Sequence, residues 1–166
     1  MSKKTLVAYY SWSCGNTEKI AEQLANACDA DVTRIETVEP YPEDYQETVD
    51  QGQREVNAGF MPEIEPPEFD PEDYDVIVIG TPTWWYTMAP AVKTFLSEND
   101  FTGKTVMALS TNGGWAGNVT ADIEGACAGA AFGPSIEVQF DSTGGDRQET
   151  PQREVEAWIN KVRDLL

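Results

Sequence analysis

The 166-residue sequence contains no histidine and little cysteine. Without an imidazole, the chain lacks the base of Ser-His and Cys-His nucleophiles and the commonest metal ligand in proteins. Its three cysteines, Cys14, Cys28 and Cys127, lie far apart and form no C-x-x-C pair, which argues against a disulfide framework or a zinc ribbon. Any chemistry must therefore come from carboxylates, hydroxyls, a thiol or a bound cofactor, and we expect no metal.

Long apolar runs are also missing. No window approaches the roughly 18 uninterrupted apolar residues that would indicate a membrane-spanning helix. The first residues lead directly into a short apolar run that has no small-residue cleavage site, so a first strand is the better interpretation than a signal peptide. We therefore expect a cytoplasmic protein without a membrane partner, formed by a single domain over residues 1–166.

Basic residues are scarce: 11 basic residues oppose 29 acidic ones, which gives a formal net charge of −18. Such a surface repels nucleic acid and anionic membranes and attracts basic proteins. We therefore expect basic-surfaced protein partners and no nucleic acid. Solubility or adaptation to a salty cytoplasm would explain the same charge.

Five short apolar runs alternate with helical patterns along the chain. The clearest run, residues 75–80, is continuous and β-branched, as a parallel strand covered on both faces requires. The predicted strands are 5–10, 31–37, 75–80, 104–109 and 135–140, and the helical patterns cover 20–28, 43–58, 90–96, 118–127 and 151–166.

This alternation predicts an α/β fold of the three-layer doubly wound type, with a five-stranded parallel sheet in the order 2-1-3-4-5. Ligands of such sheets bind beyond the carboxyl ends of the strands, at the switch point between the first and third strands. The segments after the first, third and fourth strands should therefore hold the site.

The segment after the first strand, residues 11–17, carries hydroxyls, a glycine and an asparagine but no charge. Hydroxyls and free N–H groups at a helix N-terminus are typical of a phosphate site. The G-x-x-x-x-G-K-[ST] and G-x-G-x-x-G motifs are absent, and Ile20 stands where a phosphatase loop needs arginine. The remaining interpretation is a site that binds phosphate with neutral donors alone, and the alternative is an ordinary capped turn.

The other two segments are rich in aromatic residues and glycine. Trp84, Trp85 and Tyr86 follow the strongest strand, and stacking on a flat ring by Trp84 or Trp85 explains them better than burial in a core. Residues 110–118 contain several glycines, which allow a backbone to approach a ligand closely, and Trp115, which could cover it. The alternative for the aromatic segment is packing on the next helix, and the alternative for the glycine-rich segment is a flexible surface turn.

The three segments resemble those of the flavodoxin family, over essentially the whole chain. Ser11-x-Ser13 followed by Gly15-Asn16-Thr17 resembles the phosphate loop of that family with Cys14 as an extra residue, and residues 82–84 resemble its Pro-Thr-Trp segment. Many flavodoxins place a glycine beside the flavin, but residues 82–88 contain none. The resemblance implies bound FMN and these cofactor-binding residues: Ser11, Trp12, Ser13, Cys14, Gly15, Asn16, Thr17, Pro82, Thr83, Trp84, Trp85, Tyr86, Ser110, Thr111, Asn112, Gly113, Gly114 and Trp115.

The implied function is that of a monomeric, low-potential electron carrier that moves electrons between a reductase and acceptor enzymes, without catalytic residues of its own. A low potential is expected because acidic surroundings disfavour the negative charge of reduced flavin. The main alternative is an FMN-dependent NAD(P)H:quinone or azo reductase on the same fold. A cofactor-free interaction domain is a third possibility.

Overall fold

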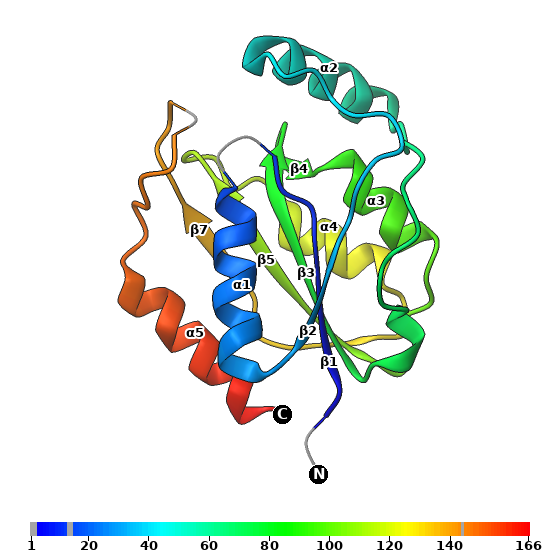
Figure 1. The fold of residues 1–166 in the computed structure, drawn as a ribbon, viewed down its shortest axis with the longest axis vertical. Coiled ribbons are helices and arrows are strands. Elements are labelled where there is room, and N and C mark those ends of the chain that lie inside the picture. Colours follow the sequence, from blue (N-terminus) through cyan, green and yellow to red (C-terminus); the bar gives the residue numbers. More distant parts are fainter. Residues whose placement is uncertain (1–2, 13–14, 144) are drawn as a thin grey trace.

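A single sheet lies at the centre of the computed structural model, which describes residues 3–12, 15–143 and 145–166 (Figure 1). Its strands follow the order β2-β1-β3-β5-β6; β4 pairs antiparallel with the end of β3, and all other pairings are parallel. The strands are β1 (Thr5–Tyr9), β2 (Asp31–Arg34), β3 (Val76–Trp84), β4 (Thr87–Met88), β5 (Thr105–Asn112), β6 (Ala131–Phe132) and β7 (Ile136–Gln139).

The predicted strand order is confirmed once the short strands are placed. β6 pairs with the start of β5 and β7 with its end, so together they form one interrupted strand at that side of the sheet. Counting β6 and β7 as the fifth strand, and β4 as an extension of β3, gives the expected order 2-1-3-4-5.

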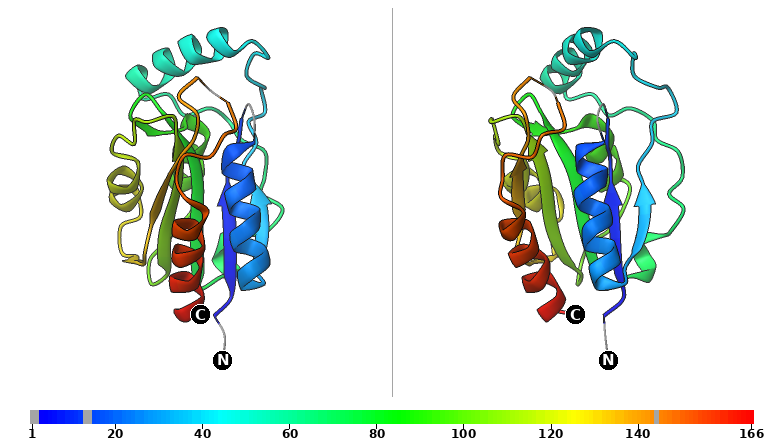
Figure 2. Two further views of the ribbon diagram at one scale, coloured as in Figure 1. Left: turned by 90° about the vertical axis from the view of Figure 1, so that its left-hand side faces the viewer. Right: turned by 60° about the vertical axis from the view of Figure 1, so that its left-hand side comes forward.

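Helices cover both faces of the sheet, so the molecule has three layers (Figure 2). α1 and α5 pack on one face, and α3 and α4 on the other. No helix in the described part of the chain has the length and apolar character needed to cross a membrane. The helices are α1 (Asn16–Cys28), α2 (Tyr45–Ala58), α3 (Pro90–Ser97), α4 (Val119–Ala126) and α5 (Gln152–Asp164), with a 3₁₀ turn, η1 (Pro71–Asp73).

The β-branched run of β3 explains why this strand anchors the core. Val76 and Val78 point into the cluster below α1 and α5, whereas Ile77 and Ile79 point into the cluster with α3 and α4. All four are at most 1% exposed. Burial of each such side chain contributes about 1.5–3 kcal/mol, so β3 is held firmly from both faces.

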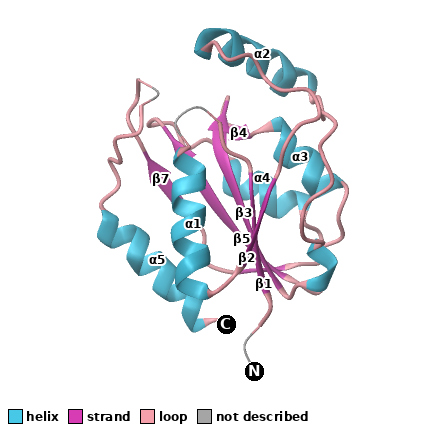
Figure 3. Ribbon diagram, viewed as in Figure 1, coloured by secondary structure: helices cyan, strands magenta, loops and turns pink. Residues whose placement is uncertain are grey.

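The remaining helix, α2, lies across the carboxyl-terminal edge of the sheet instead of on a face (Figure 1). Its buried residues are Thr48, Gly52 and Glu55, so it has no aliphatic stripe with which to cover a sheet. Figure 3 shows that the segments on either side of α2 are mostly loop. Residues from the second of these segments, including Ile64 and Tyr74, join the core beside β1 in its place.

Two strands extend past their predicted ends, and β2 stops well before its predicted end, whereas β1 and β7 lose only terminal residues. β3 continues through Trp84 and β5 through Asn112, so two of the expected loops begin as strand. β2 ends at Arg34, and Thr37 forms only an isolated bridge with Ile64. The last residues of both strands lie past the end of β1, where a ligand site is expected.

Gly80→Ala is expected to destabilise the protein by about 1–3 kcal/mol, because an added methyl group would overpack the core. A Cβ at this position would lie 2.9 Å from Cβ of Tyr9 and 3.3 Å from Cγ2 of Thr17. Gly125→Ala is the control, because a Cβ there meets nothing within 4 Å and should be neutral or stabilising. Urea unfolding measures both, and equal stabilities for the two variants would contradict the packing described here.

Candidate functional site

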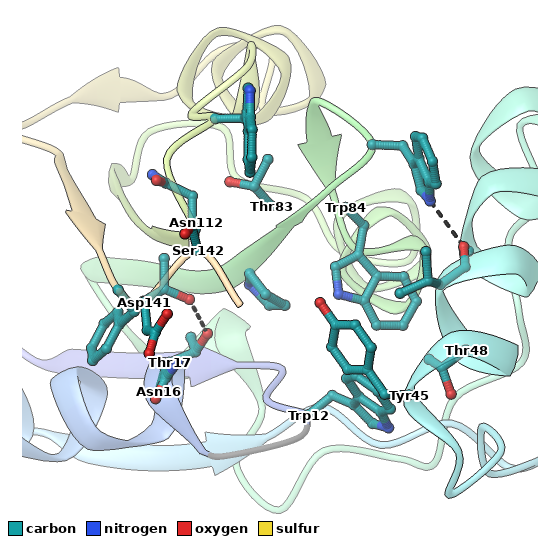
Figure 4. Close-up of a pocket in the computed structure, with 18 of the residues that line it drawn as sticks. Trp12, Asn16, Thr17, Tyr45, Thr48, Thr83, Trp84, Asn112, Asp141 and Ser142 are labelled. Atoms are coloured by element: carbon teal, nitrogen blue, oxygen red, sulfur yellow. Dashed lines mark hydrogen bonds between the residues drawn. The ribbon is translucent and has the colours of Figure 1, made fainter. Parts of the chain in front are cut away.

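A cavity of ≈ 460 Å³ lies at the carboxyl-terminal edge of the sheet, with α2 along one side (Figure 4). Its walls come from the ends of β3 and β5, from the segments that follow β1, β3, β5 and β7, from the first turn of α1 and from α2. This volume falls in the range of about 300–1,000 Å³ that is usual for sites of small molecules and cofactors. The position is the one predicted from the doubly wound topology.

The structure brings most of the candidate residues to this cavity. Ser11, Gly15, Ser110 and Gly114 do not line it, and Ser13 and Cys14 lie outside the described residues. The candidates that line the cavity are Trp12, Asn16, Thr17, Pro82, Thr83, Trp84, Trp85, Tyr86, Thr111, Asn112, Gly113 and Trp115.

Two further parts of the wall were missed by the sequence analysis. One is α2, whose polar pattern carries no signal for its place over the sheet edge. The other follows β7, and it could have been expected because the last parallel strand ends at the same edge as the others. The additional lining residues are Tyr45, Thr48, Val49, Gly52, Phe140, Asp141, Ser142 and Gly145.

One end of the cavity is polar and lies at the N-terminus of α1 (Figure 4). Gly15 is the N-cap, with a left-handed φ of 74°, and has no side chain to accept from the first N–H groups of the helix. The N–H groups of Asn16 and Thr17 have no acceptor within the helix, and no described residue accepts from them, so an anion could bind there. Thr17 Oγ1 and Thr111 Oγ1 are 2.7 Å apart, and Asn16 Nδ2 donates to the Gly145 carbonyl at 3.0 Å.

The opposite end is aromatic and lies against α2. Trp12 stacks on Tyr45 with ring centroids 5.7 Å apart, and both rings lie beside Trp84 in Figure 4. Trp84 also meets Tyr10 and Tyr41 edge to face, at 5.8 and 5.0 Å. Trp84 therefore packs in an aromatic cluster and also lines the cavity.

Trp85 and Tyr86 form the two-residue turn between β3 and β4, with φ of 47° and 70°. Turns with two such residues usually contain glycine or asparagine, because a left-handed conformation costs other residues about 1–2 kcal/mol. Two hydrogen bonds hold this turn: Trp85 Nε1 donates to the Val49 carbonyl at 3.0 Å, and the Asn118 N–H donates to the Tyr86 carbonyl at 2.7 Å. The turn thus joins α2 to the segment after β5.

The cavity wall carries one charged side chain among the described residues, that of Asp141. Hydrogen bonds from the backbone N–H and the hydroxyl of Thr143 hold the pKa of the Asp141 carboxyl below its usual value. Asp141 is therefore ionised at neutral pH. An anionic ligand would have to be bound by neutral donors and helix N–H groups.

One buried hydroxyl at the cavity has no partner. Thr83 Oγ1 is shielded from solvent, and no group in the described part of the chain hydrogen-bonds to it. A buried polar atom without a partner is uncommon and costly, so it needs an explanation. Because Thr83 lines the cavity between the polar and aromatic ends (Figure 4), a bound ligand would supply the missing partner.

A doubly wound sheet with such a cavity defines a class of α/β proteins that bind phosphorylated cofactors beyond their strand ends. The family model for flavodoxin matches residues 4–161, and the chain belongs to the flavodoxin family. The resemblance seen in the sequence is thereby confirmed.

Solved structures of flavoproteins are similar over almost the whole chain. A Bacteroides uniformis protein assigned to the flavoproteins is 26% identical, with 97% of this chain and 100% of that chain covered and a TM-score of 0.79. A Lactobacillus acidophilus flavoprotein, solved in complex with FMN, is 25% identical, with 95% and 99% covered and a TM-score of 0.71. A flavodoxin of Streptococcus pneumoniae, at 13% identity, 98% and 99% coverage and a TM-score of 0.59, shares the fold. No curated protein matches the chain.

Gly117→Ala is expected to displace the turn at the cavity mouth. A Cβ at Gly117 would collide with the Tyr86 carbonyl oxygen, in addition to the strain of its φ of 60°. Gly103→Ala is the matched control, because φ there is 79° but a Cβ meets nothing within 4 Å. Urea unfolding should show a loss of about 1 kcal/mol for Gly103→Ala and a clearly larger loss for Gly117→Ala. Equal losses would show that the contact with Tyr86 does not constrain the turn.

Proposed function

We propose that this protein is an electron carrier that holds one FMN in the cavity and transfers electrons between a reductase and acceptor enzymes. The observation that carries the proposal is the chemical contrast between the two ends of one cavity. The polar end offers N–H groups and hydroxyls at the N-terminus of α1, and the aromatic end offers the rings of Trp12, Tyr45 and Trp84. FMN has the same division, between a phosphorylated chain and a flat ring.

The donor set fits this cofactor. The backbone N–H groups of Asn16 and Thr17 would bind the phosphate, and the unpartnered hydroxyl of Thr83 would bond to a polar atom of the ligand. When bound, FMN supplies one- and two-electron redox chemistry that the side chains of this chain do not offer. The protein itself would bind and orient the cofactor and shield it from solvent. The FMN complex of the Lactobacillus acidophilus flavoprotein supports this choice of cofactor.

The charge of the cavity favours a carrier over an NAD(P)H-dependent reductase. A nicotinamide dinucleotide brings a pyrophosphate, which proteins usually bind with arginine, lysine or a glycine-rich helix N-terminus. Among the described residues, no lysine or arginine lines the cavity, and Asp141 adds a negative charge. The N-terminus of α1 is assigned to the FMN phosphate, and that of α2, where Tyr45 lines the cavity, is capped by the Asp44 carboxylate. The described part of the cavity wall therefore offers no second site for a phosphate.

The surface charge supports basic redox partners. A net charge of −18 would steer a basic protein toward the molecule. Tyr86 and Trp115, which are 58% and 62% exposed, stand at the cavity where such a partner would approach. We place this carrier in the cytoplasm as a monomer with basic-surfaced partners.

Stopped-flow mixing of the reduced, FMN-loaded protein with cytochrome c, a basic haem protein, tests the carrier. The transfer rate should fall at least about tenfold as ionic strength rises, because salt screens the attraction. NAD(P)H should be oxidised no faster than by free FMN. Rapid steady-state oxidation of NAD(P)H would instead indicate the reductase, and transfer that is independent of salt would contradict steering by the acidic surface.

Thr83→Val should weaken FMN binding up to about tenfold, the usual effect of losing one hydrogen bond, without lowering the stability of the apoprotein. Its hydroxyl has no hydrogen-bond partner among the described residues that the substitution could remove. Thr81→Val is the matched control on the same strand, because Thr81 Oγ1 accepts from the Ala89 N–H at 3.0 Å. That variant should lose stability instead. Fluorescence titration with FMN and urea unfolding measure the two effects, and unchanged FMN affinity in Thr83→Val would remove Thr83 from the site.

A further inference from the structure

Arg34 joins the edge of the sheet to the segment that begins the polar end of the cavity. It is the last residue of β2, which pairs with β1. Its Nη2 donates to the Ser11 carbonyl oxygen at 3.0 Å, and its Nη1 donates to Glu18 Oε2 at 2.8 Å. The guanidinium also lies over the ring of Tyr9, 5.8 Å from its centroid. One side chain therefore contacts the end of β1, the segment after it and the first turn of α1.

A third hydrogen bond closes the arrangement. The backbone N–H of Glu18 donates to Ser11 Oγ at 3.3 Å, so Ser11 is held at both its carbonyl and its hydroxyl. Ser11 is 4% exposed and does not line the cavity. Its contacts are therefore internal, and they fix where the segment between β1 and α1 starts relative to the helix N-terminus.

No other basic residue supplies this contact. Among the lysines and arginines, Arg34 is the only one whose side chain donates a hydrogen bond to residues 11, 12 and 15–17, the described part of the segment. Its guanidinium is itself outside the cavity wall. Among the described residues, Arg34 also lies 3.4 Å from Glu36 through its Nε, but only its contacts with Ser11 and Glu18 lead to the polar end of the cavity.

We propose that Arg34 is a positioning residue for the phosphate of the ligand. The proposal rests on the proposed function. A site that binds an anion with neutral N–H and hydroxyl donors depends on those donors being aimed before the ligand arrives, because ordering them on binding reduces affinity. Arg34 holds Ser11 and the first turn of α1 in place with a rigid fork of donors that a lysine lacks. Its bond to the Ser11 carbonyl also polarises that peptide group, whose N–H belongs to Trp12.

An ordinary surface ion pair is the competing explanation. The side chains of Arg34 and Glu18 are 41% and 35% exposed, and such pairs contribute little to stability. The two explanations differ in what they affect. An ion pair of this kind would have no selective effect on the affinity for a phosphorylated ligand. A positioning residue would affect only the part of the affinity that the phosphate contributes.

Titration of wild type and variants with FMN and with riboflavin, which lacks the phosphate, separates them. Arg34→Met should weaken the affinity for FMN at least about tenfold and change the affinity for riboflavin less than about twofold. Arg34→Lys, which keeps the charge but not the fork, should fall in between. Arg153→Met is the control for net charge, since Arg153 is exposed on α5, and it should bind both ligands as wild type does.

Equal losses for FMN and riboflavin in Arg34→Met would overturn the proposal in favour of a general structural role. FMN binding by Arg34→Met that equals that of Arg153→Met would overturn it as well. A wild-type protein that binds neither ligand would overturn the proposed function and this inference with it. If wild type binds both ligands tightly, the proposed function stands and the variants test this inference alone. If Arg34→Met fails to fold, the ratio of FMN to riboflavin affinity in Arg34→Lys decides, and a ratio equal to that of wild type would overturn the proposal.

Discussion

The parallel register of the three central strands is the constraint on which the rest of the structure depends. Tyr9 of β1 pairs with Gly80 of β3, and Gly80 pairs with Leu109 of β5, so the three strands are aligned at one level. The segments that follow them therefore meet at one edge, where α1 also begins. Because Gly80 has no side chain, Tyr9 and Thr17 can pack against its backbone and bring the helix N-terminus close to the strand ends.

Electrostatics shape the site as much as geometry does. The molecule is strongly acidic and the cavity carries an ionised Asp141, yet the proposed ligand is a phosphate ester. Neutral donors can bind such an anion only if they are fixed in advance and pointed at it. Two sets of contacts fix these donors. One is the hydrogen bond between Thr17 and Thr111, which joins the first turn of α1 to β5, and the other is formed by Arg34 outside the cavity. Acidic surroundings would also keep the reduced flavin a strong electron donor.

The sequence predicted the fold and the edge of the sheet that holds the cavity because both follow from the β-branched run of β3 and the alternation of strands and helices. It did not place α2, since a helix whose buried residues are Thr48, Gly52 and Glu55 has no apolar stripe to indicate a partner. The turn at Trp85 and Tyr86 was hidden for a similar reason, because neither residue is typical of a left-handed turn. Contacts made across the fold stabilise that turn, and local patterns do not report such contacts.

The most direct test of this account is a titration of the purified apoprotein with FMN, followed by the visible flavin bands and by tryptophan fluorescence. We predict saturation at one FMN per chain, shifted flavin bands, quenching of the indoles beside the cavity, and a higher unfolding midpoint in the presence of the ligand. A protein that remains colourless and unchanged in fluorescence at saturating FMN would contradict the central claim that this cavity is a flavin site.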